Sequence, residues 1–237
     1  PEIISRETYS KIMDMAAGFK RIAASEYIME THLHAEAAEV DFSLRVLAQE
    51  KAALINCLNS HDFTLLAGDE SWGKITGFIK SWPPGCSDIW LEMDCGEHDK
   101  EIPRPCFFFN ASSLKNNLGI DYDLLYKSLS HLLDLSKLAA IWPDLNKVIR
   151  KLPQEVGLFQ IGVMLARNND RVRVFTAELT REQVPAYLAA INWEGSYEEL
   201  EQLFKLVHPF SDGQYIVDFD VTKQGISEKI GINFGLA

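Results

Sequence analysis

The chain has 237 residues and a formal net charge of −11, and 47% of its residues are hydrophobic and 24% charged. This composition is typical of a soluble globular protein, and the acidic excess argues against a nucleic-acid partner, which needs a clustered basic surface. No apolar run is long enough to span a membrane, and the first residues lack the pattern of a signal peptide, so we expect a cytoplasmic protein without a membrane partner.

The first 60 residues predict helices. Residues 7–31 are rich in Ala, Met, Glu and Lys and place apolar side chains at helical spacing. Residues 41–43 suit a helix cap, and a second helix is expected from Val46 to Leu58. Because no Gly/Ser-rich linker divides the chain, we expect a single domain spanning residues 1–237, with a separate arm formed by the helical residues 1–60 as the alternative.

An acidic β-hairpin follows a third predicted helix, Ser71 to Trp82, which the Pro-Pro-Gly sequence at 83–85 ends. Strand residues 89–95 alternate between apolar side chains and carboxylates, so Glu92 and Asp94 are expected on one face. The partner strand is expected at residues 106–109, after a long turn at 96–105.

The second half of the chain alternates helices and hairpins. Leucine spacing predicts an amphipathic helix over 121–142 that Pro143 ends, with a shorter helix over 144–151. A hairpin is expected from strands 159–167 and 171–179, joined by a turn at 168–170. Two helices then begin at capping boxes, Thr180 to Gln183 and Ser196 to Glu199, before a last hairpin of strands 215–221 and 230–234.

These elements predict an α+β protein with one antiparallel sheet of about six strands, built from three β-hairpins and covered by interleaved helices. The two acidic hairpins repeat one pattern, since Asp218 and Asp220 alternate with apolar residues as Glu92 and Asp94 do, which suggests internal duplication. The interleaving resembles the αββα repeats of barrel prenyltransferases, in which helices surround an antiparallel barrel with a polar lumen. Those barrels have more strands than this sequence predicts, and a shared fold does not give a function.

The candidate functional residues lie on the polar face of the predicted sheet. If the three hairpins join, carboxylates, arginines and an indole share that face and line either a binding cavity or a solvated surface. Strand register decides which residues meet there, and the sequence does not fix the register. The proposed ligand-binding residues are Trp90, Gln160, Arg171, Arg173 and Asn233, and the proposed catalytic residues are Glu92, Asp94, Asp218 and Asp220.

The carboxylates are compatible with two kinds of chemistry. Asp218 and Asp220 form a DxD sequence, which can hold Mg²⁺ or Mn²⁺ through oxygen ligands, and Glu92 with Asp94 could act as a general acid/base pair. The four cysteines, Cys57, Cys86, Cys95 and Cys106, match no metal-ligand spacing. No nucleotide-binding loop, nucleophile elbow or zinc-protease motif is present, so we assign no metal site and no resident cofactor.

Two functions remain open at this point. The favoured hypothesis is a non-catalytic binding or accessory protein that holds a peptide, a protein partner or a small ligand on the polar sheet face or on the helical N-terminal arm. The alternative is a transferase or hydrolase of specialised metabolism, in which the four carboxylates act on an anionic substrate held by Arg171 and Arg173. The sequence determines neither the ligand nor the oligomeric state.

Overall fold

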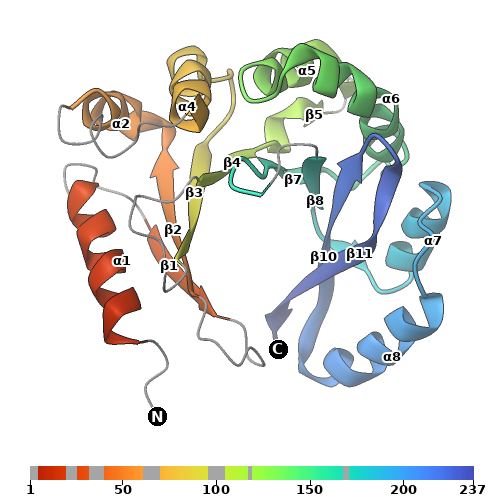
Figure 1. The fold of residues 1–237 in the computed structure, drawn as a ribbon. Coiled ribbons are helices and arrows are strands. Elements are labelled where there is room, and N and C mark those ends of the chain that lie inside the picture. Colours follow the sequence, from red (N-terminus) through yellow and green to blue (C-terminus); the bar gives the residue numbers. More distant parts are fainter. Residues whose placement is uncertain are drawn as a thin grey trace. The chain divides into compact units, whose positions relative to one another are not determined.

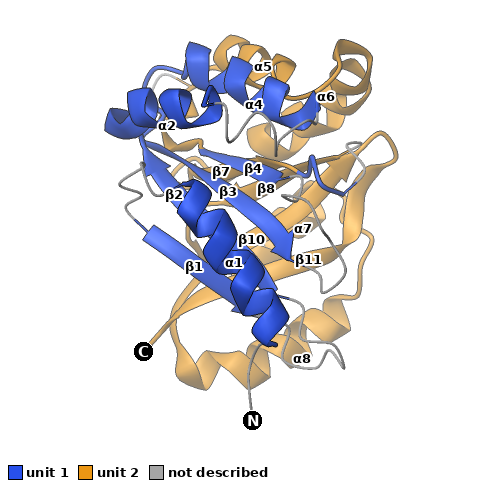
Figure 2. Cartoon of the chain, turned by 60° about the vertical axis from the view of Figure 1, so that its left-hand side comes forward, with its two compact units in different colours: residues 1–109, 164–169 blue, residues 110–163, 170–237 orange. Residues whose placement is uncertain are grey.

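The structure is a computed structural model that describes residues 5–19, 26–31, 40–60, 70–95, 105–116, 119–167 and 171–237. Its contacts divide the chain into two compact units (Figure 2). The first unit comprises residues 1–109 and 164–169, and the second comprises residues 110–163 and 170–237. The expectation of a single domain spanning residues 1–237 stays a prediction.

The first unit contains four consecutive antiparallel strands, which we call the first strand set (Figure 1). They are β1 (Glu26–Thr31), β2 (Val40–Leu47), β3 (Asp88–Cys95) and β4 (Pro105–Asn110). The helices of this unit are α1 (Arg6–Gly18), α2 (Lys51–Leu58, after the 3₁₀ turn Ala48–Glu50) and α4 (Glu70–Ser81).

Among the described residues of the first unit, helices lie on one face of the first strand set. Phe78 of α4 packs its ring against Phe107 and Phe109 of β4, with centroids 4.8 and 5.1 Å apart. Leu91 and Met93 of β3 are fully buried on this face. Alternation along β3 therefore places Glu92 and Asp94 on the opposite face, as the sequence predicted.

The predicted helical N-terminal third is wrong in part. Helix α1 ends at Gly18, and the strands β1 and β2 follow in segments for which the sequence predicted helix and a helix cap. Strand β2 alternates buried Val40, Phe42, Leu44 and Val46 with more polar residues, and this period of two buries one face against α2 and its neighbours. The second predicted helix corresponds to α2, which begins at Lys51 rather than at Val46.

The second unit contains the second strand set, β7 (Leu158–Val163), β8 (Arg171–Thr176), β10 (Ser211–Thr222) and β11 (Gly225–Leu236), paired antiparallel in this order. The short strand β9 (Leu179–Thr180) pairs with the start of β10, and β5 (Lys115–Asn116) with β6 (Gly119–Ile120). Helices α5 (Tyr122–Ser130), α6 (Leu135–Arg150), α7 (Gln183–Ala190) and α8 (Tyr197–Val207) complete the unit, with the 3₁₀ turns Ser112–Leu114 and His208–Phe210.

Helices of the second unit also cover one face of its strands (Figure 1). Tyr187 of α7 packs against Phe219, and Phe204 of α8 packs against Tyr215, with ring centroids 6.2 and 4.9 Å apart. Val217 lies on the same buried face. Asp218 and Asp220 therefore project from the face that these helices leave uncovered.

The α+β class and the antiparallel pairing are confirmed, but the number of strands is wrong. The sequence predicted about six strands, whereas the first strand set alone has four and the second has four besides β9. In the first unit, the two strands that the sequence did not predict are β1 and β2. The predicted turns at 96–105 and 168–170 fall almost entirely outside the described residues.

The helix boundaries in the second unit differ from the prediction around Pro143. The predicted helix over 121–142 is two helices separated at residues 131–134, and Pro143 lies inside α6 instead of ending it. Thr180 and Gln183 exchange the two hydrogen bonds of the predicted capping box, although α7 begins only at Gln183 with Glu182 as its N-cap. The second predicted cap is present at α8, where Ser196 accepts from the Glu199 N–H at 3.2 Å. The apolar residues of α6 recur at helical spacing, and their packing stabilises the helix by more than the loss of the one hydrogen bond that the proline removes.

Candidate functional site

Each unit carries a cluster of carboxylates and arginine on the strand face that its described helices leave uncovered. We call these the Arg167 cluster, formed by Asp41, Glu92, Asp94 and Arg167 in the first unit, and the Asp220 cluster, formed by Arg171, Arg173, Asp218, Asp220 and Asn233 in the second. The carboxylates of the first cluster and the residues of the second lie on neighbouring strands, where side chains on one face are about 5 Å apart, whereas Arg167 lies in the bend after β7.

Arg167 holds three carboxylates together in the first unit. Asp41 of β2 lies directly opposite Asp94 of β3, and Glu92 lies two residues before Asp94 on the same face. The guanidinium donates to both Asp94 oxygens at 2.7 and 2.6 Å, to Glu92 at 3.2 Å and to Asp41 at 3.5 Å. Two parallel bonds to one carboxylate are the strongest arrangement of an arginine ion pair, so Asp94 fixes the position of Arg167.

Burial gives Glu92 an unusual protonation equilibrium. Its side chain is only 17% exposed, and this burial raises the pKa of Glu92 to about 7, against a lowering effect of Arg167. The charges of Asp41, Glu30 and Asp94 also raise it. A carboxyl group that is half protonated near neutral pH can both donate and accept a proton, which an ordinary surface glutamate cannot do at that pH.

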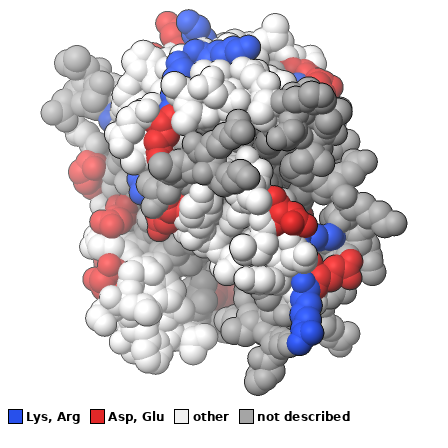
Figure 3. Space-filling view, turned by 90° about the vertical axis from the view of Figure 1, so that its left-hand side faces the viewer, with Lys and Arg blue, Asp and Glu red and all other residues white. Residues whose placement is uncertain are grey.

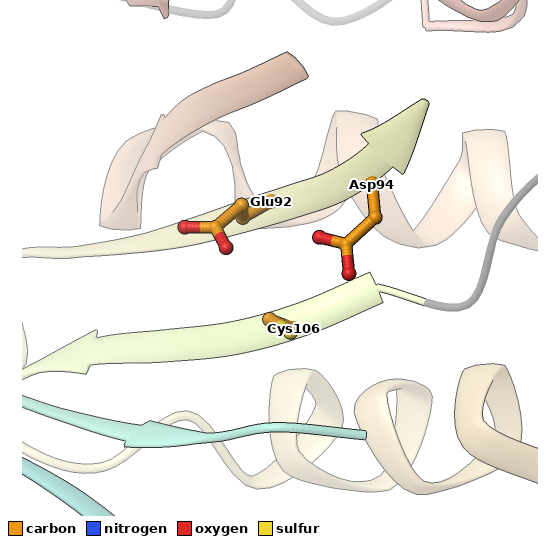
Figure 4. A group of neighbouring side chains, drawn as sticks. All are labelled: Glu92, Asp94 and Cys106. Carbon is orange, nitrogen blue, oxygen red and sulfur yellow. The ribbon is translucent and has the colours of Figure 1, made fainter. Parts of the chain in front are cut away.

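Cys106 lies beside these carboxylates but is a poor metal ligand here. It faces Glu92 across β3 and β4, and one ligand atom each from Glu92, Asp94 and Cys106 lies within 4.8 Å of the others (Figure 4). Burial, together with the charge of Glu92, raises the pKa of the Cys106 thiol to about 12, so the thiol stays protonated. Arg167 already supplies the positive charge that the two carboxylates attract.

Trp90 lies next to the Arg167 cluster on the same face of β3. It is paired across the strands with Arg45 of β2 and with Phe108 of β4. The Arg45 guanidinium lies 5.9 Å from the indole centroid and donates to the buried Asp88 carboxylate at 3.1 Å. Trp90 thus provides a partly exposed aromatic surface that is held by a cation–π contact with Arg45, which is itself fixed by its ion pair with Asp88.

The Asp220 cluster neutralises one buried carboxylate with two arginines. Arg173 donates to both oxygens of Asp220 at 2.8 and 3.1 Å, and Arg171 donates to it at 3.1 Å. Burial opposes ionisation of Asp220, but the hydrogen bonds and charges of Arg173 and Arg171 outweigh it and lower its pKa. Asp218 lacks such a close arginine, because Arg173 is 3.9 Å away, and burial raises its pKa.

Asn233 and Gly231 of β11 shape the surroundings of Asp218. The Asn233 amide donates to the Asp218 carboxylate at 2.9 Å. Gly231 lies directly opposite Asp218 in the strand pair, and a Cβ atom at this position would collide with the carboxylate. Because glycine has no side chain, position 231 leaves room for the Asp218 carboxylate.

We expect Gly231→Ala to lower the free energy of unfolding by about 1 kcal/mol, because the methyl group displaces Asp218 from the hydrogen bond with Asn233. Gly73→Ala is the matched control: nothing lies within 4 Å of its added Cβ. Since Gly73 lies inside α4, that change should raise stability by up to about 1 kcal/mol. Urea denaturation of both variants measures the difference, and equal stabilisation by the two changes would contradict the role given to Gly231.

The sequence-predicted residues are thus divided between the two units. Glu92, Asp94 and Trp90 share one strand face, and Asp218, Asp220, Arg171, Arg173 and Asn233 share another. Gln160 is buried on β7, opposite Phe175 in the strand pair. Their roles in binding or catalysis stay predictions.

Sequence reasoning missed Arg167 and Asp41, which complete the first cluster. Arg167 was placed in a predicted strand, whereas β7 ends at Val163 and residues 164–169 belong to the first unit. Asp41 was assigned to a helix cap, although its position between buried Val40 and Phe42 gave a strand signal. Arg171 and Arg173 were assigned to an anionic substrate, and both bond to Asp220.

Charges on the face in Figure 3 are scattered, and no continuous basic patch forms among the residues described there. No helix within the described ranges is long and apolar enough to span a membrane. The expectations of no nucleic-acid partner and of a cytoplasmic location stay predictions.

No family model and no curated protein matches this chain. Among solved structures, it is similar to the crystal structure of AnaPT from Neosartorya fischeri, with 10% sequence identity and a TM-score of 0.49. The similarity covers 87% of this chain and 58% of AnaPT, so the chain spans less than two thirds of that protein. A likeness this remote carries no argument about function.

Proposed function

We propose that the protein is a binding protein that holds a small ligand on the helix-free face of the first strand set. The observation that supports this most is the burial of two carboxylates of the Arg167 cluster, Glu92 and Asp41. Glu92 and Asp41 keep only 17% and 19% of their side-chain surface exposed, whereas a purely solvated sheet face would leave such carboxylates in water. Charged groups held away from water with an aromatic neighbour are typical of ligand sites.

The charge of the cluster indicates which ligand it favours. Three carboxylates face one guanidinium, so with all groups ionised the cluster carries a net charge of −2. A cationic or hydrogen-bond-donating group on the ligand would be attracted to the surplus carboxylates. The partly exposed Trp90 offers aromatic surface beside them. The proposed ligand is therefore a small aromatic amine, and peptides or protein partners are less favoured at this face.

The test is a thermal-shift titration with 2-phenylethylamine and, as an anionic counterpart, phenylacetate. A ligand that binds only the folded state raises stability by about 2.7 kcal/mol at a hundredfold excess over Kd. We expect the amine to raise the Tm of the wild type, and to raise the Tm of Trp90→Leu and Glu92→Gln by a smaller amount. In the control Glu178→Gln, which changes an exposed glutamate of the second unit, the rise in Tm should equal that of the wild type. Equal shifts by amine and carboxylate, or an unchanged shift in Trp90→Leu, would contradict the proposal.

The pKa of Glu92 keeps a transferase or hydrolase as the second candidate. A carboxyl group with a pKa of about 7 is suited to general acid/base catalysis near neutral pH, with Asp94 beside it. Under this alternative Asp218 and Asp220 would bind Mg²⁺ or Mn²⁺ with an anionic substrate. The same thermal-shift titration with Mg²⁺, Mn²⁺ and inorganic pyrophosphate discriminates between the two candidate functions. A rise in Tm that is seen in the wild type and lost in the Asp94→Asn/Asp220→Asn double variant would favour the enzyme over the binding protein.

A further inference from the structure

A groove of about 780 Å³ lies on the other side of the second strand set, beside α8. Its wall on one side is the start of α8 with the preceding loop, and on the other side residues Glu228 to Ile230 of β11. Ile230 is paired with Phe219, whose ring contacts α7, so the groove is on the helix-covered side. It is therefore distinct from both carboxylate clusters, and its volume is in the range of ligand-binding pockets.

Trp193 joins the two walls of this groove. Its indole N–H donates to the Glu228 carbonyl at 2.9 Å, and its ring packs edge-on against Tyr197 with centroids 5.1 Å apart. Gly195 lies so close to the Trp193 ring and the Glu228 carbonyl that a Cβ atom there would collide with them. Since these contacts join the loop to β11, the groove is preformed and needs little ordering when it binds a partner.

Apolar side chains line the groove and continue beyond it along α8. Leu200, Leu203 and Ile230 lie in the groove. Leu203 and Leu206 are three residues apart on one face of α8, and Phe210 follows at the end of the 3₁₀ turn. Leu206 and Phe210 are 69% and 62% exposed. Such a run of exposed large side chains on adjoining turns is typical of an interaction surface rather than of scattered surface leucines.

The apolar stripe extends to the end of β11. The Ala237 N–H donates to the Phe210 carbonyl at 2.9 Å, so the last residues of β11 lie beside the turn that follows α8. Leu236, at this end, is 82% exposed. The stripe therefore runs from the groove beside Glu228 to Leu236, a length that fits a peptide segment better than a compact small molecule.

Acidic side chains border the groove. Glu194, Glu199 and Glu228 line it with one lysine, Lys229, which gives the lining a net charge of −2. A second copy of this chain carries a net charge of −11 and would be repelled overall, whereas lysine and arginine side chains of a partner would be attracted. We infer that this groove and its apolar stripe bind a basic amphipathic segment of a partner protein, with leucine-type side chains on the stripe and basic side chains against the glutamates.

The probe for this site is a fluorescein-labelled synthetic peptide of Leu and Lys residues in helical spacing, measured by fluorescence anisotropy. A peptide with Glu in place of Lys, and a Leu/Lys peptide of scrambled order, serve as comparison probes. The test variants are Leu206→Gln and Glu199→Gln/Glu228→Gln, in which only exposed side chains change. Their matched controls are Leu135→Gln, which is 62% exposed on α6, and Glu178→Gln.

We expect the Leu/Lys peptide to bind the wild type and both controls alike, and to bind Leu206→Gln about tenfold more weakly, since burying one leucine contributes this order of affinity. The double glutamine variant should bind more weakly at low salt and show a smaller salt dependence. Equal binding of the Leu/Glu or scrambled peptide, or equal affinity in all variants, would overturn the inference. Self-association that Leu206→Gln abolishes would assign the stripe to a second copy and overturn it as well.

Discussion

Replacing Arg167 by methionine is expected to lower the free energy of unfolding by about 2 kcal/mol. The change removes the hydrogen bonds to Asp94 and Glu92 and leaves three neighbouring carboxylates without their shared cation. Breaking a fully buried ion pair costs about 3–5 kcal/mol, and the expected loss is smaller because Arg167 itself is 42% exposed and partly screened by water. Methionine retains most of the apolar stem, so lost packing contributes little.

Arg171→Met is the matched control for this experiment. Arg171 has the same 42% exposure and also bonds to a buried carboxylate, but Asp220 keeps its two hydrogen bonds to Arg173 when Arg171 is removed. We expect a loss below about 1 kcal/mol for this variant. Urea denaturation at one pH measures both losses. If the two variants lose equal stability, Arg167 does not hold the cluster together in the way described.

A second measurement separates charge from packing at Arg167. In the double variant Arg167→Met/Asp94→Asn the repulsion within the cluster is smaller, so the loss should be less than the sum of the two single losses. Additive losses would indicate that Arg167 and Asp94 stabilise the protein independently, against the bidentate contact seen between them.

The acidic strands could be predicted from the sequence because their signal is local. Alternation along residues 89–95 and 215–221 fixes which side chains share a face, and the buried fractions of Leu91, Met93, Val217 and Phe219 confirm it. The capping boxes of α7 and α8 are local in the same way, since cap and partner lie three residues apart.

Strand β2 shows where local reasoning gave the wrong structure. Its alternation of Val40, Phe42, Leu44 and Val46 was present in the sequence, but Asp41 and Ser43 also suit a helix cap. Strand β2 pairs along its whole length with β3, which comes much later in the chain, and residues 40–45 also pair with β1, so both sides of the strand form backbone hydrogen bonds. A cap offers only one or two hydrogen bonds, so the sheet prevails over the local preference.

The candidate site could be predicted only in part for the same reason. Glu92 and Asp94 were recognised on one face, but Arg167 is 73 residues from Asp94 along the chain. Nothing in the residues around Arg167 indicates which carboxylates it contacts. Its partners depend on strand register and on the path by which the chain comes back to the first strand set, and local sequence encodes neither of these. The arginines that were recognised, Arg171 and Arg173, contact Asp220 instead.

The stability of the protein should depend on pH through Glu92. Its pKa is raised from 4.5 to about 7 in the folded protein by burial, so between these values the folded state binds more protons than the unfolded state. Stability contributed by this group is therefore greatest below pH 4.5 and is lost as the pH rises through about 7. The full linked change is on the order of 3–4 kcal/mol, because each pKa unit between 4.5 and about 7 corresponds to about 1.4 kcal/mol.

Comparison with Glu92→Gln isolates this contribution from the other groups that titrate in the same range. Glutamine is uncharged at every pH, so the variant should gain stability relative to the wild type by about 2 kcal/mol between pH 5 and pH 8. The measurement is urea denaturation at both pH values, with Glu178→Gln as the control whose difference from the wild type stays constant, because that side chain lies in solvent. A Glu92→Gln difference that is also constant with pH would show that Glu92 ionises as an ordinary surface glutamate does, and it would remove the acid/base candidate.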